Sequence, residues 1–226
     1  KLDVTSPTDA EAAAQAAVDH FGRIDVLDNN AGSFVAGFFE QLSQKQIEQQ
    51  LAVMLLGPMN VTRAVLPVMR KQHSGHIISI SSGAGMMGFA YNSAYCAAKF
   101  GLEGWMESLA PEVEPFGIHT TIVNPGFFRT ELLSPESTSF AELSIEDYAE
   151  STKEQNAWWK AQHRQQAGDP AKLAQALLSI VSQEKPQSRF LASADVITVA
   201  EQKAAALQQQ ANADREIAMS TGLDSV

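Results

Sequence analysis

The sequence has little cysteine and little positive charge, and both shortages exclude classes of protein. Cys96 is the single cysteine in 226 residues, which excludes an internal disulfide framework and leads us to expect a reducing, cytoplasmic location. The formal net charge of −10 argues against a nucleic-acid-binding surface. No uninterrupted apolar run reaches the roughly 18 residues of a transmembrane helix, and no signal peptide is visible. We therefore expect neither a nucleic acid nor a membrane as partner.

Metal-ligand and hydrolase motifs are also missing from the sequence. The five histidines have no ligand-like spacing, and a paired-cysteine site is impossible, so no metal site is predicted. The segment Ser81-Ser82-Gly83-Ala84-Gly85 comes near the Gly-x-Ser-x-Gly elbow of serine hydrolases. It lacks the glycine before the serine, which disfavours that chemistry.

What the chain does contain is an alternation of helical and strand-like segments. Its apolar content of 45% can form a sizeable core, and no Gly/Ser/Pro-rich linker divides it, so residues 1–226 are expected to form one domain. Helices are expected at residues 9–21, 43–72, 93–116, 170–183 and 194–210, and strands at 24–30, 76–81, 119–123 and 189–191. We expect Thr8 or Asp9 to cap the first helix, and Pro58 and Pro67 to bend or divide the second. The alternation predicts an α/β fold with a doubly wound parallel sheet.

Tyr95 and Lys99 are the most informative residues. They stand four apart in a predicted helix, so their side chains share one face. An ammonium close to a phenol lowers its pKa from about 10, which makes the tyrosine a usable proton donor and acceptor. Ser82 follows a predicted buried strand and could present its hydroxyl to the same place, with Ser81 as the competing candidate. The alternative is a packed tyrosine beside a solvated lysine.

Other candidate residues also lie at strand ends. Asn30, Ser82 and Asn124 each come at or just after the end of a predicted strand. In parallel sheets, ligands bind beyond the carboxyl ends of the strands, so these residues are expected to share one edge. The small residues Ala31-Gly32 and the turn Pro125-Gly126 would let a ligand pass close to the main chain. Each pair taken alone is equally compatible with a simple turn.

Together these ordered motifs resemble the short-chain dehydrogenase/reductase superfamily. The motifs are residues 29–32, 93–99 and 124–126 with Thr130, and the resemblance is strong over residues 1 to about 133. It implies a Rossmann-type fold and reversible hydride transfer between NAD or NADP and a small-molecule carbonyl or secondary alcohol. It further implies that Tyr95 is the general acid/base, that Lys99 lowers the pKa of Tyr95 and holds the nicotinamide ribose, and that Ser82 binds the substrate oxygen.

The resemblance also assigns cofactor contacts and a substrate lid. The matching cofactor-binding positions are Asp3, Val4, Asn30, Ala31, Gly32, Tyr95, Lys99, Pro125, Gly126, Phe128 and Thr130. Residues at about 127–168 match the variable lid of the family, and their apolar side chains suggest a hydrophobic substrate. The pair Trp158-Trp159 belongs either to this lid or to a packed core or oligomer face.

Two departures from the family pattern favour an alternative function. Residues 1–5 resemble the end of the third strand of the family, so the N-terminal βαβα portion with its Gly-rich turn is expected to be absent from the given chain. Met54 stands where the family has an asparagine of the proton relay, and a thioether is a poor hydrogen-bond partner. The alternative is a catalytically weak or inactive relative that serves as a scaffold. In either case we expect a homodimer or homotetramer formed through the helices at 43–72 and 93–116.

Overall fold

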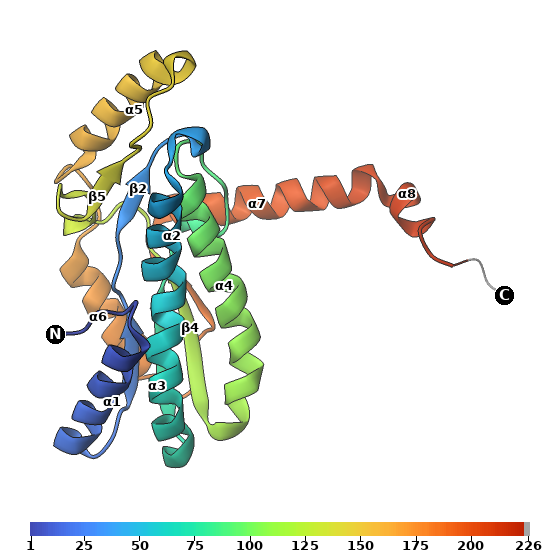
Figure 1. The fold of residues 1–226 in the computed structure, drawn as a ribbon. Coiled ribbons are helices and arrows are strands. Elements are labelled where there is room, and N and C mark those ends of the chain that lie inside the picture. Colours follow the sequence, from blue (N-terminus) through green and yellow to red (C-terminus); the bar gives the residue numbers. More distant parts are fainter. Residues whose placement is uncertain (224–226) are drawn as a thin grey trace.

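Four parallel strands form the main sheet in the computed structural model, which describes residues 1–223 (Figure 1). In sheet order these strands are β1 (Val26–Asn29), β3 (Gly75–Ile80), β4 (Ile118–Asn124) and β6 (Arg189–Leu191). Ile77 in β3 lies opposite Leu27 in β1 and Thr120 in β4. The predicted parallel α/β sheet is therefore confirmed, with strand bounds within two residues of those expected.

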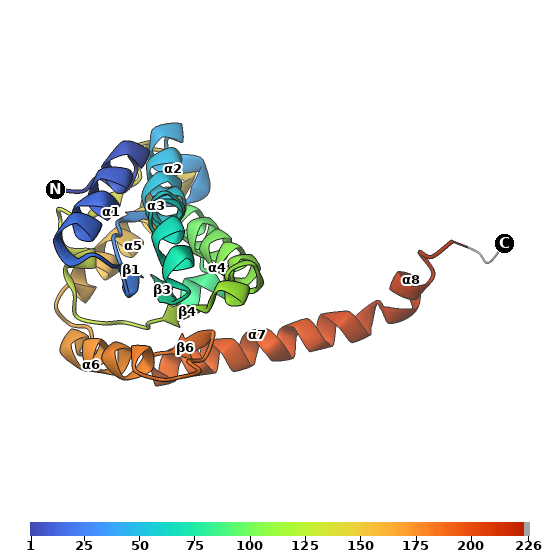
Figure 2. The ribbon, with the colours of Figure 1, turned by 90° about the horizontal axis from the view of Figure 1, so that it is seen from below.

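Helices cover both faces of this sheet, as the predicted doubly wound architecture requires. On one face lie α1 (Pro7–Phe21), α3 (Gly57–Gln72) and α4 (Ser93–Val113), and on the other lie α6 (Pro170–Val181) and the start of α7 (Ala194–Ala213) (Figure 2). A second pair of parallel strands, β2 (Phe34–Ala36) and β5 (Thr138–Phe140), lies outside the main sheet. This pair was not predicted, because strands of three residues leave little periodicity to read.

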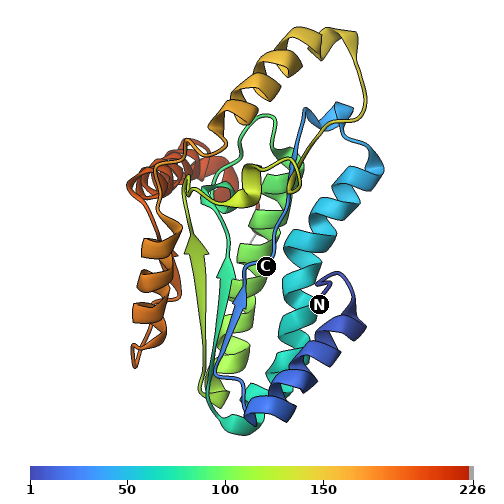
Figure 3. The same cartoon turned by 90° about the vertical axis from the view of Figure 1, so that its left-hand side faces the viewer.

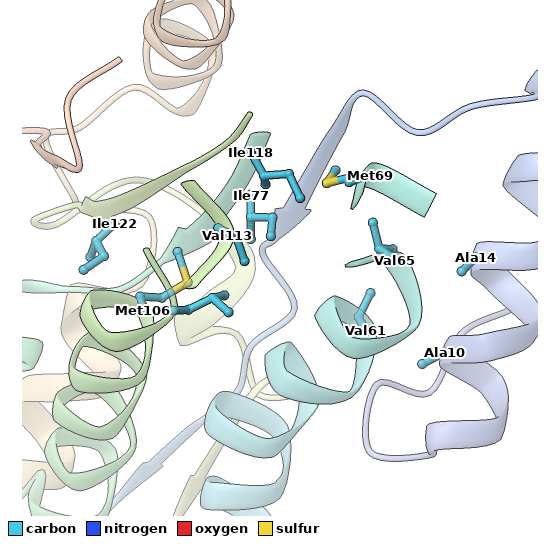
Figure 4. Close-up of a cluster of buried hydrophobic side chains, with 11 residues drawn as sticks. Ala10, Ala14, Val61, Val65, Met69, Ile77, Met106, Val113, Ile118 and Ile122 are labelled. Carbon is cyan, nitrogen blue, oxygen red and sulfur yellow. The ribbon is translucent and has the colours of Figure 1, made fainter. Parts of the chain in front are cut away.

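The main core lies between α1, α3, α4 and the sheet (Figure 4). Val61, Val65 and Met69 are spaced four apart on α3 and form one buried stripe. They pack with Ala10 and Ala14 of α1, whose small side chains let the two helices approach closely. Burial of each larger side chain contributes about 1.5–3 kcal/mol, so this stripe fixes α3 on the sheet.

The predicted helix at 43–72 is one continuous helical run made of three elements. Ser43 caps α2 (Gln44–Leu51) through a capping box with Gln46, and a π-helical segment (Ala52–Leu56) joins α2 to α3. Pro58 lies in the first turn of α3, directly after the π-helical segment, and it cannot donate a backbone hydrogen bond to that segment. The division therefore comes just before Pro58, whereas Pro67 is accommodated inside α3.

The helical run Gln44–Gln72 is also long and apolar. By length and composition alone, Gln44–Gln72 could cross a membrane, with a mean hydropathy of 1.5 in its most apolar window. No uninterrupted apolar run marks it in the sequence, because polar residues are interspersed. In this fold α3 contributes Val61 and Val65 to the core and packs against α1 and β3, as the core helix of a globular domain does.

The expected cap of α1 was wrong, and the expected cap of α6 was right. Ser6 caps α1, its side-chain oxygen accepting the N–H of Asp9 at 3.2 Å. Pro7 occupies the first helical position, so the cap falls one residue before it rather than at Thr8 or Asp9. Asp169 caps α6 by accepting the N–H of Ala171 at 2.9 Å.

The C-terminal part projects from the body of the molecule. Beyond its first turns α7 extends away from the sheet, followed by α8 (Arg215–Met219) (Figures 1 and 2). The predicted loose tail after residue 212 thus contains helix α8, and its end at 224–226 lies outside the described residues. On another side, α5 (Ala149–Gln162) lies beyond the carboxyl ends of β3 and β4, where it can cover a site at that edge (Figure 3).

Candidate active site

Ser82 is positioned by the end of β3. The strand ends at Ile80, and the chain enters a short 3-10 turn, Gly83–Gly85. The Ser82 hydroxyl accepts the N–H of Ala84 at 3.1 Å, and Ser82 lies close enough to Tyr95 to act on the pKa of its hydroxyl. Ser81 faces elsewhere, since its hydroxyl donates to Glu103 at 2.5 Å. The geometry therefore separates the two serine candidates in favour of Ser82.

Tyr95 and Lys99 lie on the buried face of α4. Their exposed fractions are 8% and 4%, and the Lys99 Nζ is 5.8 Å from the centroid of the Tyr95 ring. The ammonium donates a hydrogen bond to the carbonyl of Ile80 at 2.6 Å, which ties α4 to the end of β3. The structure thus brings together Ser82, Tyr95 and Lys99, and the reading of Lys99 as a solvated surface residue is wrong.

Burial controls the protonation of this pair. It raises the pKa of Tyr95 to about 12, and the nearby Ser82 hydroxyl opposes that shift. It lowers the pKa of Lys99 to about 7, and the charge of Glu103 opposes that shift. The Tyr95 pKa is therefore not below its ordinary value of about 10 in this arrangement, because burial is the largest influence on it. A lysine with a pKa near 7 can take up and release a proton at neutral pH.

The small residues after β1 are open to solvent, as a binding edge requires. Asn30, Ala31 and Gly32 are all exposed. The preceding Asn29 is buried and has a structural task, donating to Thr62 and Ser79 at 3.1 and 3.2 Å.

Met54 fills the space beside this edge. It is 3% exposed, and its sulfur accepts the N–H of Ser33 at 3.3 Å. A Cβ built on Gly32 would lie 3.0 Å from the same sulfur, so a larger residue there would press against Met54. Met54 thus has a defined packing role at the position where the family has an asparagine.

Val4 packs against the first turn of α3, and Asp3 precedes it in the chain. The Asp3 carboxylate accepts both the N–H and the hydroxyl of Thr5, at 2.9 and 2.7 Å. The Val4 carbonyl accepts from Asn60 at 3.1 Å, and the Val4 side chain packs against Gly57. These contacts hold the first residues of the chain beside the end of the π-helical segment.

The segment after β4 carries the remaining predicted contacts. Pro125 and Gly126 follow the end of β4 and are half-buried, with Gly126 facing Ser193 at the start of α7. Phe128 pairs with Gly168 in an isolated bridge. Thr130 is exposed, and its hydroxyl accepts the N–H of Leu132 at 3.4 Å. This segment starts from the same sheet edge as Ser82, because Asn124 at the end of β4 donates a hydrogen bond to the Ser82 carbonyl at 2.8 Å.

Aromatic side chains form a continuous packed group beside Tyr95. The Phe34 ring meets the Tyr95 ring edge-on at 5.2 Å, and Trp159 of α5 lies 4.7 Å from Phe34. Phe127 stacks on Trp159 at 6.1 Å. Of the tryptophan pair, Trp159 belongs to this group, whereas Trp158 is 48% exposed. Trp159 packs against the buried cluster that contains Phe34 and Tyr95, and its role in a substrate lid stays a prediction.

Sequence reasoning missed a buried polar cluster behind the site. Its members are Ser81, Glu103, Asn124 and Arg189, joined by hydrogen bonds of 2.5 to 3.0 Å. The available signal was the position of Glu103, four residues after Lys99 on the same face of one helix. An acidic residue on a buried helical face needs partners, and its presence there could have been noticed.

Comparison with known proteins agrees with this geometry. The sequence profile described as short chain dehydrogenase matches residues 1–139. The chain belongs to the short-chain dehydrogenase family. Among curated relatives of this dehydrogenase, 3-ketodihydrosphingosine reductase from Bacteroides thetaiotaomicron is 37% identical over 188 residues, which cover 83% of this chain and 70% of the relative.

Two solved structures show the same fold. A short-chain dehydrogenase from Streptomyces avermitilis has a TM-score of 0.87 and 34% identity, covering 98% of this chain and 80% of that one. A metagenomic short-chain oxidoreductase in complex with NADP has a TM-score of 0.62 and 27% identity, covering 84% and 71%. The first match includes nearly all of this dehydrogenase, so its C-terminal half follows the family fold as well.

Proposed function

We propose that this dehydrogenase transfers hydride between NAD or NADP and the carbonyl or secondary alcohol of a hydrophobic small molecule. The observation that carries the proposal is the meeting of Ser82, Tyr95 and Lys99 at the carboxyl edge of the sheet. Ser82 lies beside Tyr95, and the Lys99 amine is buried 5.8 Å from the centroid of the Tyr95 ring. Two hydroxyls and a titratable amine in one partly closed site are suited to moving a proton to or from an oxygen.

The residues at this edge fit a nicotinamide nucleotide. Ala31 and Gly32 leave the main chain open to a ligand, and the Lys99 ammonium has three donors, of which one has a partner among the described residues. By the family pattern, Asp3, Val4 and Asn30 would hold the adenosine part. Pro125, Gly126, Phe128 and Thr130 would hold the nicotinamide. When bound, the nicotinamide supplies or accepts the hydride.

The proton would move through this chain's own side chains. In reduction, the Tyr95 hydroxyl gives its proton to the substrate oxygen, and in oxidation it takes that proton back. Ser82 donates a hydrogen bond to the same oxygen and stabilises the negative charge that develops there. Lys99, with its pKa of about 7, returns the proton to Tyr95 at neutral pH.

A hydrophobic substrate is supported by the aromatic group. Phe34 packs against Tyr95, and Trp159 and Phe127 extend this apolar aromatic group outward from it. These rings would also exclude water, which strengthens the hydrogen bonds to the substrate oxygen. The curated relative from Bacteroides carries a ketone in the name of its substrate, which agrees with carbonyl chemistry at this site.

A second candidate function is a weakly active or inactive scaffold. It is favoured by Met54, whose buried thioether replaces the family asparagine with a weak acceptor. A protein of this kind would retain the fold and the oligomer contacts but exchange protons slowly.

We propose the same assembly and location for both functions. A homodimer or homotetramer formed through α2–α3 and α4 is supported by exposed apolar side chains on these helices, such as Leu56 (51%) and Phe100 (40%). The low cysteine content favours the cytoplasm. A monomer in light scattering at micromolar concentration would rule this assembly out.

The proposed function is tested first by cofactor binding and then by activity. NADH and NADPH are titrated by fluorescence into this chain and into the gene product extended upstream of Lys1. Carbonyl reduction is then screened with aliphatic ketones. Tyr95→Phe should lower kcat by about 10²–10⁴-fold, because general acid catalysis contributes that much.

The matched control is Tyr148→Phe, which removes a hydroxyl bonded to the exposed Glu40 and should leave kcat unchanged. The dehydrogenase function is wrong if neither form binds either nucleotide, and the scaffold function then stands. Equal activity of Tyr95→Phe and the wild type would remove Tyr95 from the mechanism.

A further inference from the structure

The buried polar cluster behind the site has no part in the proton transfer described above. At its centre, the Glu103 carboxylate uses both oxygens. Oε1 accepts from Ser81 Oγ at 2.5 Å and from Asn124 Nδ2 at 2.6 Å, and Oε2 accepts from Arg189 Nη1 at 2.5 Å. The side chain of Glu103 is 6% exposed. A carboxylate this well satisfied and this deeply buried has a fixed position.

The cluster is connected to both Ser82 and Lys99. Asn124, which donates to Glu103, also donates to the Ser82 carbonyl at 2.8 Å. Lys99 lies one helical turn before Glu103 on α4 and donates to the carbonyl of Ile80, the residue before Ser81. Glu103 therefore reaches Ser82 through Asn124, and it lies on the same helical face as Lys99.

The turn after Ser82 is shaped around this carboxylate. A Cβ built on Gly85 would overlap Glu103 Oε1 and lie 2.5 Å from Ser81 Oγ. The main chain thus closes directly over the carboxylate, which a residue with a side chain could not do. The same turn begins at Ser82, so the position of the carboxylate and that of the serine are coupled.

Stability alone is a weak reason for such an arrangement. Burial of a charged pair costs desolvation free energy that its attraction often fails to recover, and apolar residues of similar volume frequently serve as well. The negative charge of Glu103 therefore calls for an explanation beyond stability, and its neighbours supply one. The charged groups around it are Lys99 and Glu107 on α4 and Arg189 on β6, and Tyr95 lies on the far side of Lys99.

We infer that Glu103 is a positioning residue, which holds Ser82 in place through Asn124 and keeps Lys99 protonated by its negative charge. This inference rests on the proposed proton transfer through Tyr95 and Lys99. Burial has already lowered the pKa of Lys99 to about 7, and Glu103 opposes the fall. Without that charge the pKa falls further, so the ammonium is lost at neutral pH. The Tyr95 phenolate then loses a nearby cation, and the Tyr95 pKa rises.

The direct test is the pKa of Lys99 in the full-length gene product. Lysine side chains labelled with ¹³C at Cε are titrated by NMR, and the Lys99 signal is assigned by its loss in Lys99→Met. Glu103→Gln should lower the Lys99 pKa by roughly one unit, the low end of the effect of a close opposite charge, because Arg189 already neutralises part of it. The matched control is Glu107→Gln, which removes an equal charge bonded to the same Arg189 at 2.8 Å from an exposed position. It should move the Lys99 pKa by less than about 0.3 units.

Activity then separates positioning from folding. In the oxidation of an aliphatic secondary alcohol such as 2-decanol, Glu103→Gln should shift the acidic limb of the kcat profile to higher pH. At pH 7 its kcat should fall about tenfold, with a smaller change in KM. Glu103→Asp keeps the charge, so its Lys99 pKa should stay near the wild-type value even if its melting temperature is lower.

An unchanged Lys99 pKa in Glu103→Gln would overturn the inference, and so would an equal shift in Glu107→Gln. If Glu103→Gln changes neither the Lys99 pKa nor the pH profile of kcat, Glu103 has a structural role only. Tyr95→Phe, measured in parallel, keeps the two proposals apart. If Tyr95→Phe is as active as the wild type, the proposed proton transfer through Tyr95 is wrong. The Lys99 pKa measured by NMR still shows whether Glu103 acts on Lys99.

Discussion

Gly85 offers a sharp test of the packing behind the active site. In Gly85→Ala, the new methyl group would overlap Glu103 Oε1 and lie 2.5 Å from Ser81 Oγ, so the buried hydrogen bonds of Glu103 must lengthen or break. Overpacking of this kind costs about 1–3 kcal/mol, and loss of a hydrogen bond to a charged group costs a further 1.5–3 kcal/mol or so. Alanine lowers the entropy of the unfolded chain, which offsets roughly 0.4–1 kcal/mol. We expect a net loss of about 1.5–5.5 kcal/mol in the free energy of unfolding.

The measurement is urea unfolding followed by far-UV circular dichroism, together with thermal melting. For a domain of this size, the expected loss corresponds to a melting temperature lower by roughly 3–20 °C. The matched control is Gly88→Ala, three residues further along, where an added Cβ meets nothing within 4 Å. That variant should be as stable as the wild type or slightly more stable. Equal stability of Gly85→Ala and Gly88→Ala would refute the claim that the turn closes directly over the Glu103 carboxylate.

Two further predictions concern the lid and the pH dependence of stability. Trp159→Ala removes the ring that lies 4.7 Å from Phe34, and it should raise KM for the long-chain ketone 2-decanone about tenfold or more. Trp158→Ala, at a site that is 48% exposed, should change this KM much less. Steady-state kinetics with 2-decanone and 2-butanone would contradict the prediction if the two variants behaved alike. Burial, aided by His119, lowers the pKa of His76 in the folded protein to about 4. Between pH 6.5 and 4 the unfolded chain therefore binds a proton at His76 that the folded protein does not bind. The free energy of unfolding should fall as the pH drops through this window. Urea unfolding across that window should give a shallower fall for His76→Gln than for the wild type, and parallel curves would assign the pH dependence to other groups.

Much of the site could be predicted from the sequence because its signals are local. The spacing of Tyr95 and Lys99 places both side chains on one face of a helix, whatever surrounds that helix. Ser82 and Asn124 follow apolar strands, and parallel strands bring their carboxyl ends to a common edge. The alternation of segments then sufficed for the fold class, since parallel strands require crossover helices.

Some local features still escaped prediction. The cap of α1 is Ser6 because Pro7 occupies the first helical position, a competition that hydrophobic periodicity does not register. The β2–β5 pair joins residues about a hundred positions apart, and each strand is too short to show alternation.

Only the tertiary structure decided the electrostatics of the site. A tyrosine and a lysine four residues apart suggested a lowered tyrosine pKa, yet burial raises that pKa to about 12 and lowers the lysine pKa to about 7. The partners of Glu103 come from 21, 22 and 86 residues away, and no spacing along the chain connects them. The sequence determined which side chains reach the edge of the sheet, since helical and strand periodicity are properties of neighbouring residues. Removal of water and contact across the fold decided which of those groups are charged and what holds them, because both depend on atoms that are distant in the chain.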